Sequence, residues 1–131
     1  SYRSTYEIIT CAKKIIDDHM IEPVLRHGMK PKKWVVSSQE EEISSILELV
    51  EQLRKQDLAT IALITKTLVR AYEWRGLLEN QGPLVQSKGL EFDAVIVVDA
   101  DEATYPGLLG RQQLFVAATR AMHALYFLQR E

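Results

Sequence analysis

The stretch that decides the fold is VQSKGLEFDAVIVVDA, at residues 85–100. Its AVIVV segment, at residues 94–98, is apolar and β-branched, without alternating polar side chains. Such a segment is typical of a strand that is buried on both faces of a parallel sheet. The preceding SKGLEFD segment, at residues 87–93, places a lysine, a glycine and two carboxylates against the start of that strand. Ligands of open α/β sheets bind at strand ends, so this charged segment is a candidate site, although it lies at the amino end of its strand; a turn with solvated charges is the alternative.

Three further short apolar segments predict strands. They lie at residues 34–37, 60–64 and 124–128, and segments with helical spacing of apolar residues separate them. This alternation predicts an α/β fold in which helices flank a mainly parallel sheet. At 131 residues the chain is long enough for one domain with a hydrophobic core, and too short for two.

Helices are predicted where apolar residues recur at helical spacing after a residue that can cap the helix. Their expected starts are Ser4, Ser38, Thr65 and a position near residue 111. Ser4 with Glu7, and Ser38 with Glu41, have the spacing of a capping box. The glutamates at positions 40–42 fall in the first turn of the second helix, where negative charge is favourable, and we expect them to be solvated.

Composition excludes several classes of function. The chain has 16 basic and 18 acidic residues and a net charge of −2, which argues against a domain that holds nucleic acid by bulk charge but permits a local basic groove. The single cysteine, Cys11, excludes an internal disulfide and fits a reducing compartment. No apolar run approaches the ~20 residues of a membrane span, and no signal peptide opens the sequence. We therefore expect a soluble, cytoplasmic protein without a membrane partner.

The second candidate site lies in LFVAATRAMHALYFL, at residues 114–128. We expect a helix over residues 111–122, with a core stripe formed by Leu114, Ala117, Ala118 and Ala121. At ~3.6 residues per turn, Arg120 falls about 100° from this stripe and is therefore not simply buried. The alternative is a cation that is favoured only because it lies at the carboxyl end of a helix.

Three stretches together resemble the UvrD/Rep/PcrA-like superfamily 1 helicases. SYRST, at residues 1–5, resembles their motif IV; SKGLEFDAVIVVD, at residues 87–99, resembles motif V; and LFVAATRAMHALYFL resembles motif VI. The resemblance implies that residues 1–131 are the second RecA-like domain of such a motor, a three-layer P-loop NTPase-like fold within a larger polypeptide. The segments TRAMH and EFDAVIVVDA lean toward the HelD-like branch, whose members act on RNA polymerase.

The resemblance assigns catalytic roles to two arginines. Arg3 resembles the motif IV arginine and Arg120 the motif VI arginine, the pair that reaches across an interdomain cleft to the γ-phosphate. Phosphoryl transfer spreads negative charge over the terminal oxygens, and a planar, permanently charged guanidinium stabilises that charge better than a hydrated ammonium does. The chain contains no G-x-x-x-x-G-K-[ST] segment and so lacks its own P-loop. We therefore expect ATP and Mg²⁺ to be bound jointly with a first RecA-like domain, and this domain alone to be inactive.

Further roles follow from the same resemblance. Tyr2 resembles the tyrosine that stacks on the adenine base, and Glu91 the glutamate that hydrogen-bonds the ribose. Ser87, Lys88 and Gly89 belong to the motif that couples the cleft to the nucleic-acid track. The implied partners are the first RecA-like domain of the same polypeptide and single-stranded DNA, with RNA polymerase as the alternative. A non-catalytic RecA-like interaction module is the competing class of function.

Another candidate is the run of carboxylates after the buried strand. Asp99, Asp101 and Glu102 resemble a Walker B strand end with its magnesium ligands. Without a phosphate loop in the chain, we predict no metal site there and interpret these residues as a solvated strand end. A metal-dependent phosphotransfer domain that uses Asp99 is the third hypothesis.

Two segments depart from the family's pattern. Only residues 80–86 connect the predicted third helix to motif V, where the family has a longer segment with a full strand, and the loop at residues 102–110 is also short. Elsewhere, His123 is either a polar surface residue or a contact to motif V. Trp34 and Trp74 are expected to be core or interface aromatics.

Overall fold

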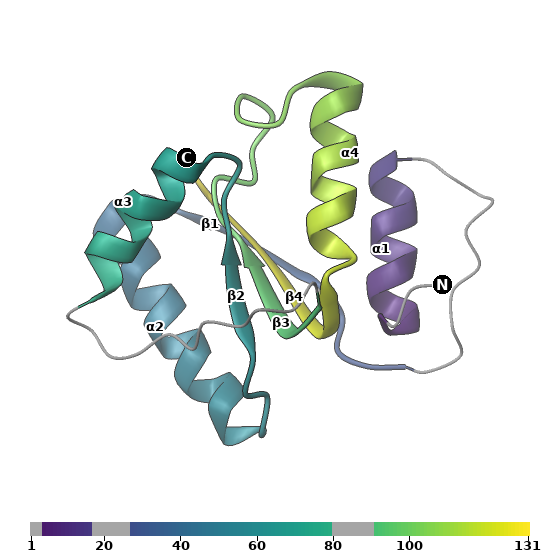
Figure 1. The fold of residues 1–131 in the computed structure, drawn as a ribbon, viewed down its shortest axis with the longest axis horizontal. Coiled ribbons are helices and arrows are strands. Elements are labelled where there is room, and N and C mark those ends of the chain that lie inside the picture. The colour runs from purple at the N-terminus through teal and green to yellow at the C-terminus, as the bar shows by residue number, and fades with distance from the viewer. Residues whose placement is uncertain (1–3, 17–26, 80–90) are drawn as a thin grey trace.

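The computed structural model describes residues 4–16, 27–79 and 91–131, and Figure 1 shows their arrangement. The described helices and strands follow one another as α1 (Tyr6–Ile16), β1 (Lys32–Val36), α2 (Gln39–Lys55), β2 (Ile61–Ile64), α3 (Leu68–Leu78), β3 (Phe92–Val97), α4 (Gly107–Ala118) and β4 (Ala121–Arg130). Helices α1 and α4 cover one face of the sheet and helices α2 and α3 cover the other (Figure 1). The predicted three-layer α/β class is therefore confirmed.

The sheet is parallel throughout its described strands, in the order β1-β4-β3-β2. The central strand β3 is buried on both faces, as its uninterrupted apolar sequence predicted. Ala94, Ile96 and Val98 pack into the core under α2 and α3, and Val95 and Val97 into the core under α1 and α4. Because the strands are parallel, all of them start at one edge of the sheet, called here the amino edge, and end at the opposite carboxyl edge.

The fourth helix differs from its prediction at both ends. Helix α4 begins at Gly107 and ends at Ala118, and strand β4 starts at Ala121. Its early start is allowed by Gly110, where a side-chain Cβ would overlap the backbone of the buried Tyr105. The expected core stripe therefore breaks before Ala121, which belongs to the strand.

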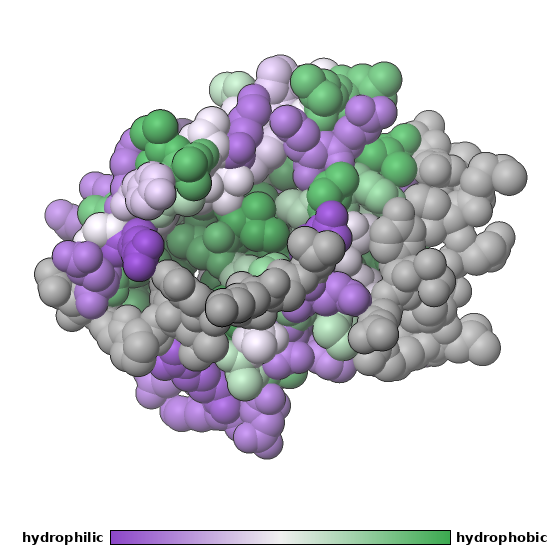
Figure 2. All heavy atoms as spheres, viewed as in Figure 1, coloured by the Kyte–Doolittle hydropathy of each residue, from purple (hydrophilic) through white to green (hydrophobic). Residues whose placement is uncertain are grey.

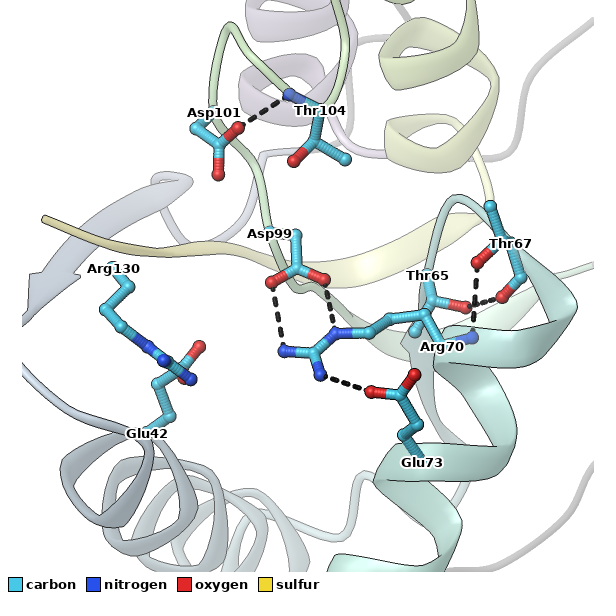
Figure 3. A network of polar contacts seen from close by, with 9 residues as sticks. All are labelled: Glu42, Thr65, Thr67, Arg70, Glu73, Asp99, Asp101, Thr104 and Arg130. Atoms are coloured by element: carbon cyan, nitrogen blue, oxygen red, sulfur yellow. Dashed lines mark hydrogen bonds and ion pairs between the residues drawn. The ribbon is translucent and has the colours of Figure 1, made fainter.

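Two predicted helix caps are wrong by one or two positions. Thr67, not Thr65, caps α3 by accepting a hydrogen bond from the backbone N–H of Arg70 at 3.1 Å, while the Thr65 hydroxyl donates to the carbonyl of Thr67 at 2.8 Å (Figure 3). In α1, Thr5 takes the capping role expected of Ser4, because its side-chain oxygen accepts from the backbone N–H of Ile8 at 3.4 Å. The cap predicted at Ser38 is confirmed.

Glu42 was expected to be solvated and is instead fully buried, at 0% exposure. Its Oε1 accepts hydrogen bonds from Nε and Nη2 of Arg130 at 3.0 and 2.6 Å, so a residue at the end of β4 supplies the compensating charge (Figure 3). Its Oε2 has no hydrogen-bond partner among the described residues. The prediction failed because the arginine that draws Glu42 inward lies far away in the sequence.

The tryptophan predictions are confirmed. Trp74 is 1% exposed in the core, and the ring of Trp34 packs against that of Tyr126 with centroids 5.6 Å apart. Among the helices that the structure describes, none has both the length and the apolar character required to cross a membrane.

Replacing Arg130 by alanine is expected to lower the free energy of unfolding by about 1–3 kcal/mol, because Glu42 would keep a buried carboxylate without its partner. Urea denaturation of the wild type and variant measures this loss. Lys55→Ala is the control: its ion pair with Glu51, at 3.6 Å, is exposed, so its loss should stay below about 0.5 kcal/mol. Equal losses in the two variants would show that Glu42 does not depend on Arg130.

Candidate functional site

The candidate site lies at the amino edge of the sheet, around Arg120. Two residues connect α4 to β4, and Arg120 is the second of them. The Thr119 hydroxyl ends the helix by donating to the carbonyls of Phe115 and Val116 at 3.1 Å each. The helical angle used to predict the exposure of Arg120 is therefore wrong, because this residue lies beyond the helix. The expectation itself holds, since Arg120 is half-buried.

The backbone of Arg120 is held on both sides. Its N–H donates to the carbonyl of Ala117 at 3.2 Å, and its carbonyl accepts from the N–H of Phe92 at 2.8 Å. The second of these bonds joins the start of β4 to the start of β3. Among the described residues, the Arg120 side chain forms no ion pair. The main chain of Arg120 is therefore fixed by hydrogen bonds, while its side chain has no ion-pair partner among the described residues.

Ser4 joins a third segment to this place. Its hydroxyl contacts the carbonyls of Ala121, at 2.5 Å, and Thr119, at 3.3 Å, which are the carbonyls on either side of Arg120. Ser4 is 1% exposed, so water does not compete for these bonds. The described parts of the stretches that resemble motifs IV, V and VI therefore meet at the amino edge, although Ser4 and Ala121 are separated by 117 positions.

The predicted site residues divide into two groups. Arg120 and Glu91 are described, and Glu91 is exposed directly before Phe92, so its backbone lies beside that of Arg120. Tyr2, Arg3, Ser87, Lys88 and Gly89 lie outside the described residues.

Asp93 joins two strands at the amino edge and had no role assigned from the sequence. Its Oδ2 accepts the backbone N–H groups of Ala59 and Thr60 at 3.0 and 3.1 Å, and the Thr60 hydroxyl accepts the N–H of Asp93 at 2.8 Å. Asp93 thus fastens the start of β2 to the start of β3. Nε2 of His123 lies 4.0 Å from its Oδ1, which supports the interpretation of His123 as a contact to motif V.

Glu7 holds another segment against the start of α1. It was expected to complete a capping box with Ser4, but its Oε1 accepts the backbone N–H of Gly28 at 2.8 Å and its Oε2 lies 2.8 Å from Nδ1 of His27. The bond with His27, followed by that with Gly28, holds the pKa of Glu7 below its usual value. Gly28 lies so close that a Cβ there would come within 2.7 Å of Cγ2 of Thr5. The first turn of α1 is therefore packed from outside as well as from the sheet.

The carboxyl edge has a different character, because its charges are paired internally. Asp99 accepts from Nε and Nη2 of Arg70 at 2.8 and 3.3 Å, and Nη1 of Arg70 donates to Glu73 at 2.9 Å (Figure 3). The backbone of Asp99 has a φ of 52°, a left-handed conformation. Asp99 was expected to be a solvated strand end, but its carboxylate instead forms an ion pair with Arg70. A metal ion at Asp99 would have to displace Arg70.

Exposed apolar side chains gather at the same carboxyl edge. Figure 2 shows hydrophobic surface over the ends of α3 and α4 that lie there. Its described members are Leu68, Val69, Leu108 and Leu109, in the first turns of the two helices. The two loops leading to these helices are joined by a hydrogen bond of 2.5 Å from Nζ of Lys66 to the carbonyl of Thr104. The polar candidate site and this apolar surface therefore lie at opposite edges.

The fold is that of a RecA-like α/β domain. Residues 84–128 match the family described as UvrD-like helicase C-terminal domain. The crystal structure of the C-terminal domain of a possible DNA helicase from Lactobacillus plantarum WCFS1 is similar, with a TM-score of 0.81 and 29% identity, covering 98% of this chain and 87% of that chain. No curated protein matches the sequence.

Both findings confirm the resemblance to the carboxy-terminal domain of UvrD-like helicases. The matched residues 84–128 contain the motif V and motif VI stretches. The similar solved structure covers nearly the whole chain, including the part with Ser4 and α1. The HelD-like branch stays a prediction.

Acidification is expected to release residues 27–28 from α1. The pKa of Glu7 lies below its usual 4.5, so its contacts contribute stability that is fully present above that value and is lost as the pH falls through the lower folded value. The NMR chemical shift of the Gly28 amide, followed from neutral pH downward, measures this transition. Glu7→Gln is the control and should lose it. An unchanged transition in that variant would assign the titration to another group.

Proposed function

We propose that this chain is the second RecA-like domain of an ATP-dependent DNA helicase or translocase. It supplies one wall of an ATP site, and a first RecA-like domain of the same polypeptide supplies the P-loop wall. The observation that carries the proposal is Arg120, which is half-buried, fixed through its backbone and without an ion pair among the described residues. Burying a cation without a counter-charge is unfavourable, so this geometry favours an anionic group from outside.

The described residues fit a terminal phosphate as that anion. A guanidinium stays charged at any physiological pH and presents donors in a planar fork that matches phosphate oxygens. No carboxylate is positioned at Arg120 to compete with such a ligand among the described ion pairs, whereas Arg70 and Arg130 are both held by carboxylates. Among the described residues, Arg120 is therefore a half-buried arginine whose side chain forms no ion pair that a phosphate would have to displace.

The proposed nucleotide contacts follow from this position. Arg120 and Arg3 stabilise the negative charge that develops on the γ-phosphate oxygens, Tyr2 stacks on the adenine and Glu91 holds the ribose. The adjacency of Glu91 to Arg120, through the bond between Phe92 and Arg120, supports placing ribose and phosphate contacts on one edge. ATP supplies the phosphoryl group and Mg²⁺ offsets its charge, and we place the magnesium ligands on the first domain because Asp99 is occupied by Arg70.

Coupling to nucleic acid is the second part of the proposal. Ser87, Lys88 and Gly89 precede β3 in the sequence, separated from it by two residues, and the first residue of β3 is bonded to Arg120. Closure of the two domains on ATP brings the arginines to the phosphate and moves this domain along single-stranded DNA. The printed name of the similar solved structure, a possible DNA helicase, supports DNA as the track. RNA polymerase as the partner is the alternative outcome.

Arg120→Ala is expected to lower the rate of ATP hydrolysis by about 10³-fold or more, the lower end for an arginine that stabilises the transferred phosphoryl group. The measurement is steady-state ATP hydrolysis by the polypeptide that carries both RecA-like domains, with and without single-stranded DNA. Arg111→Ala is the matched control, because Arg111 lies on α4 but is exposed and away from the amino edge. Its rate should equal that of the wild type.

The outcomes separate the competing functions. Stimulation of ATP hydrolysis by single-stranded DNA supports the helicase hypothesis, and stimulation by RNA polymerase alone supports the HelD-like alternative. An unchanged rate in Arg120→Ala would contradict the proposal and leave a RecA-like interaction module.

A further inference from the structure

The Ser4 hydroxyl contacts the residues on either side of Arg120, Thr119 and Ala121, and these contacts have no role in the proposed function. A serine hydroxyl has one proton to donate, and here it is shared between the carbonyls of Ala121 and Thr119, at 2.5 and 3.3 Å. A capping role would have used this hydroxyl on the first N–H groups of α1, but Thr5 satisfies that need. Ser4 therefore contacts Arg120's neighbours and not its own helix.

The bonds around Arg120 restrict both of its backbone dihedral angles. The peptide plane before its Cα contains the Thr119 carbonyl and the Arg120 N–H, which are bonded to Ser4 and Ala117. The plane after its Cα contains the Arg120 carbonyl, which is bonded to Phe92. With both planes held, the Cα–Cβ bond of Arg120 has one direction. Ser4 is the member of this set that comes from outside the sheet and α4.

We propose that Ser4 is a positioning residue that aims Arg120 at the phosphate and ties the motif IV segment to it. Ser4 and Thr5 are the described residues of the motif IV stretch, and the bonds of Ser4 join that stretch to the residues on either side of Arg120. This inference rests on the proposed function of the two arginines. A misplacement of about 1 Å at a catalytic group costs up to ~10²-fold in rate, so a single hydroxyl at this position has a measurable effect.

The packing of α1 keeps Ser4 beside Arg120. Ile8 and Ala12 pack into the core with Ala118, at the end of α4, and Ala121, at the start of β4. Burial of these apolar side chains fixes α1 against the two elements that flank Arg120. The Ser4 hydroxyl is thereby placed within hydrogen-bond distance of the carbonyls of Thr119 and Ala121.

The test is ATP hydrolysis by the two-domain polypeptide carrying Ser4→Ala, Arg120→Ala or both. We expect Ser4→Ala to lower kcat about 10- to 100-fold with little change in the KM for ATP, because the arginine acts in the transition state. In the Arg120→Ala background, Ser4→Ala should have no further effect on kcat, since it acts through that side chain. Ser4→Cys keeps a weak donor of similar shape and should recover part of the rate.

Thr5→Ala is the matched control for general damage to α1. It removes the hydroxyl and the methyl group of the adjacent, equally buried residue, whose hydroxyl caps the helix, whereas the described hydrogen bonds to the Thr119 and Ala121 carbonyls come from Ser4. Thermal unfolding should show a comparable loss of Tm in Thr5→Ala and Ser4→Ala, whereas only Ser4→Ala should lower kcat.

The other possible results distinguish failure of the positioning role of Ser4 from failure of the proposed function of Arg120. Normal kcat in Ser4→Ala with a large loss in Arg120→Ala overturns the positioning role and leaves the proposed function intact. Equal losses of kcat in Thr5→Ala and Ser4→Ala, or a further loss in the double variant, would show that Ser4 only stabilises α1. Normal kcat in Arg120→Ala would overturn the proposed function itself. Should Ser4→Ala fail to fold, the same comparisons are made with Ser4→Cys, whose weaker bond predicts an intermediate kcat.

Discussion

The parallel pairing of β3 with β4 is the constraint on which the rest of the structure depends. These are the two central strands, and their apolar residues fill the cores on both faces of the sheet. The pairing starts at the hydrogen bond between Phe92 and Arg120. Burial of the two strands therefore also fixes their first residues, and the polar groups of two distant segments meet because the hydrophobic core aligns the strands that carry them.

Local sequence patterns predicted the parts of the fold that local forces decide. The uninterrupted apolar segment of β3 was sufficient to predict a doubly covered parallel strand, and Ser38 caps α2 as its spacing with Glu41 predicted. The patterns failed where two neighbouring residues could serve equally. Ser4 and Thr5 are both good caps, and the choice between them is made by the carbonyls of Thr119 and Ala121, which no local pattern contains.

The same limit applies to the charged residues. Glu42 stands in a run of three glutamates, and its neighbours in the sequence give no sign that Arg130 draws it into the core. Asp99 looked like a solvated or metal-binding strand end, but Arg70 approaches it from another helix. For Arg120 the helical angle was the wrong argument, because the helix ends at Ala118. Its motif context, not its periodicity, indicated the site.

The two edges of the sheet both carry arginines, and they differ in whether those arginines form ion pairs with carboxylates. At the carboxyl edge, the half-buried Arg70 is paired with Asp99, and the exposed Arg130 supplies the charge that offsets the burial of Glu42. Arg75 and Arg111 are exposed, so water solvates them. Arg120 is half-buried, so water solvates it only in part, and it forms no ion pair among the described residues. In the proposed ATP site, the counter-charge of Arg120 is a phosphate bound jointly with the first RecA-like domain.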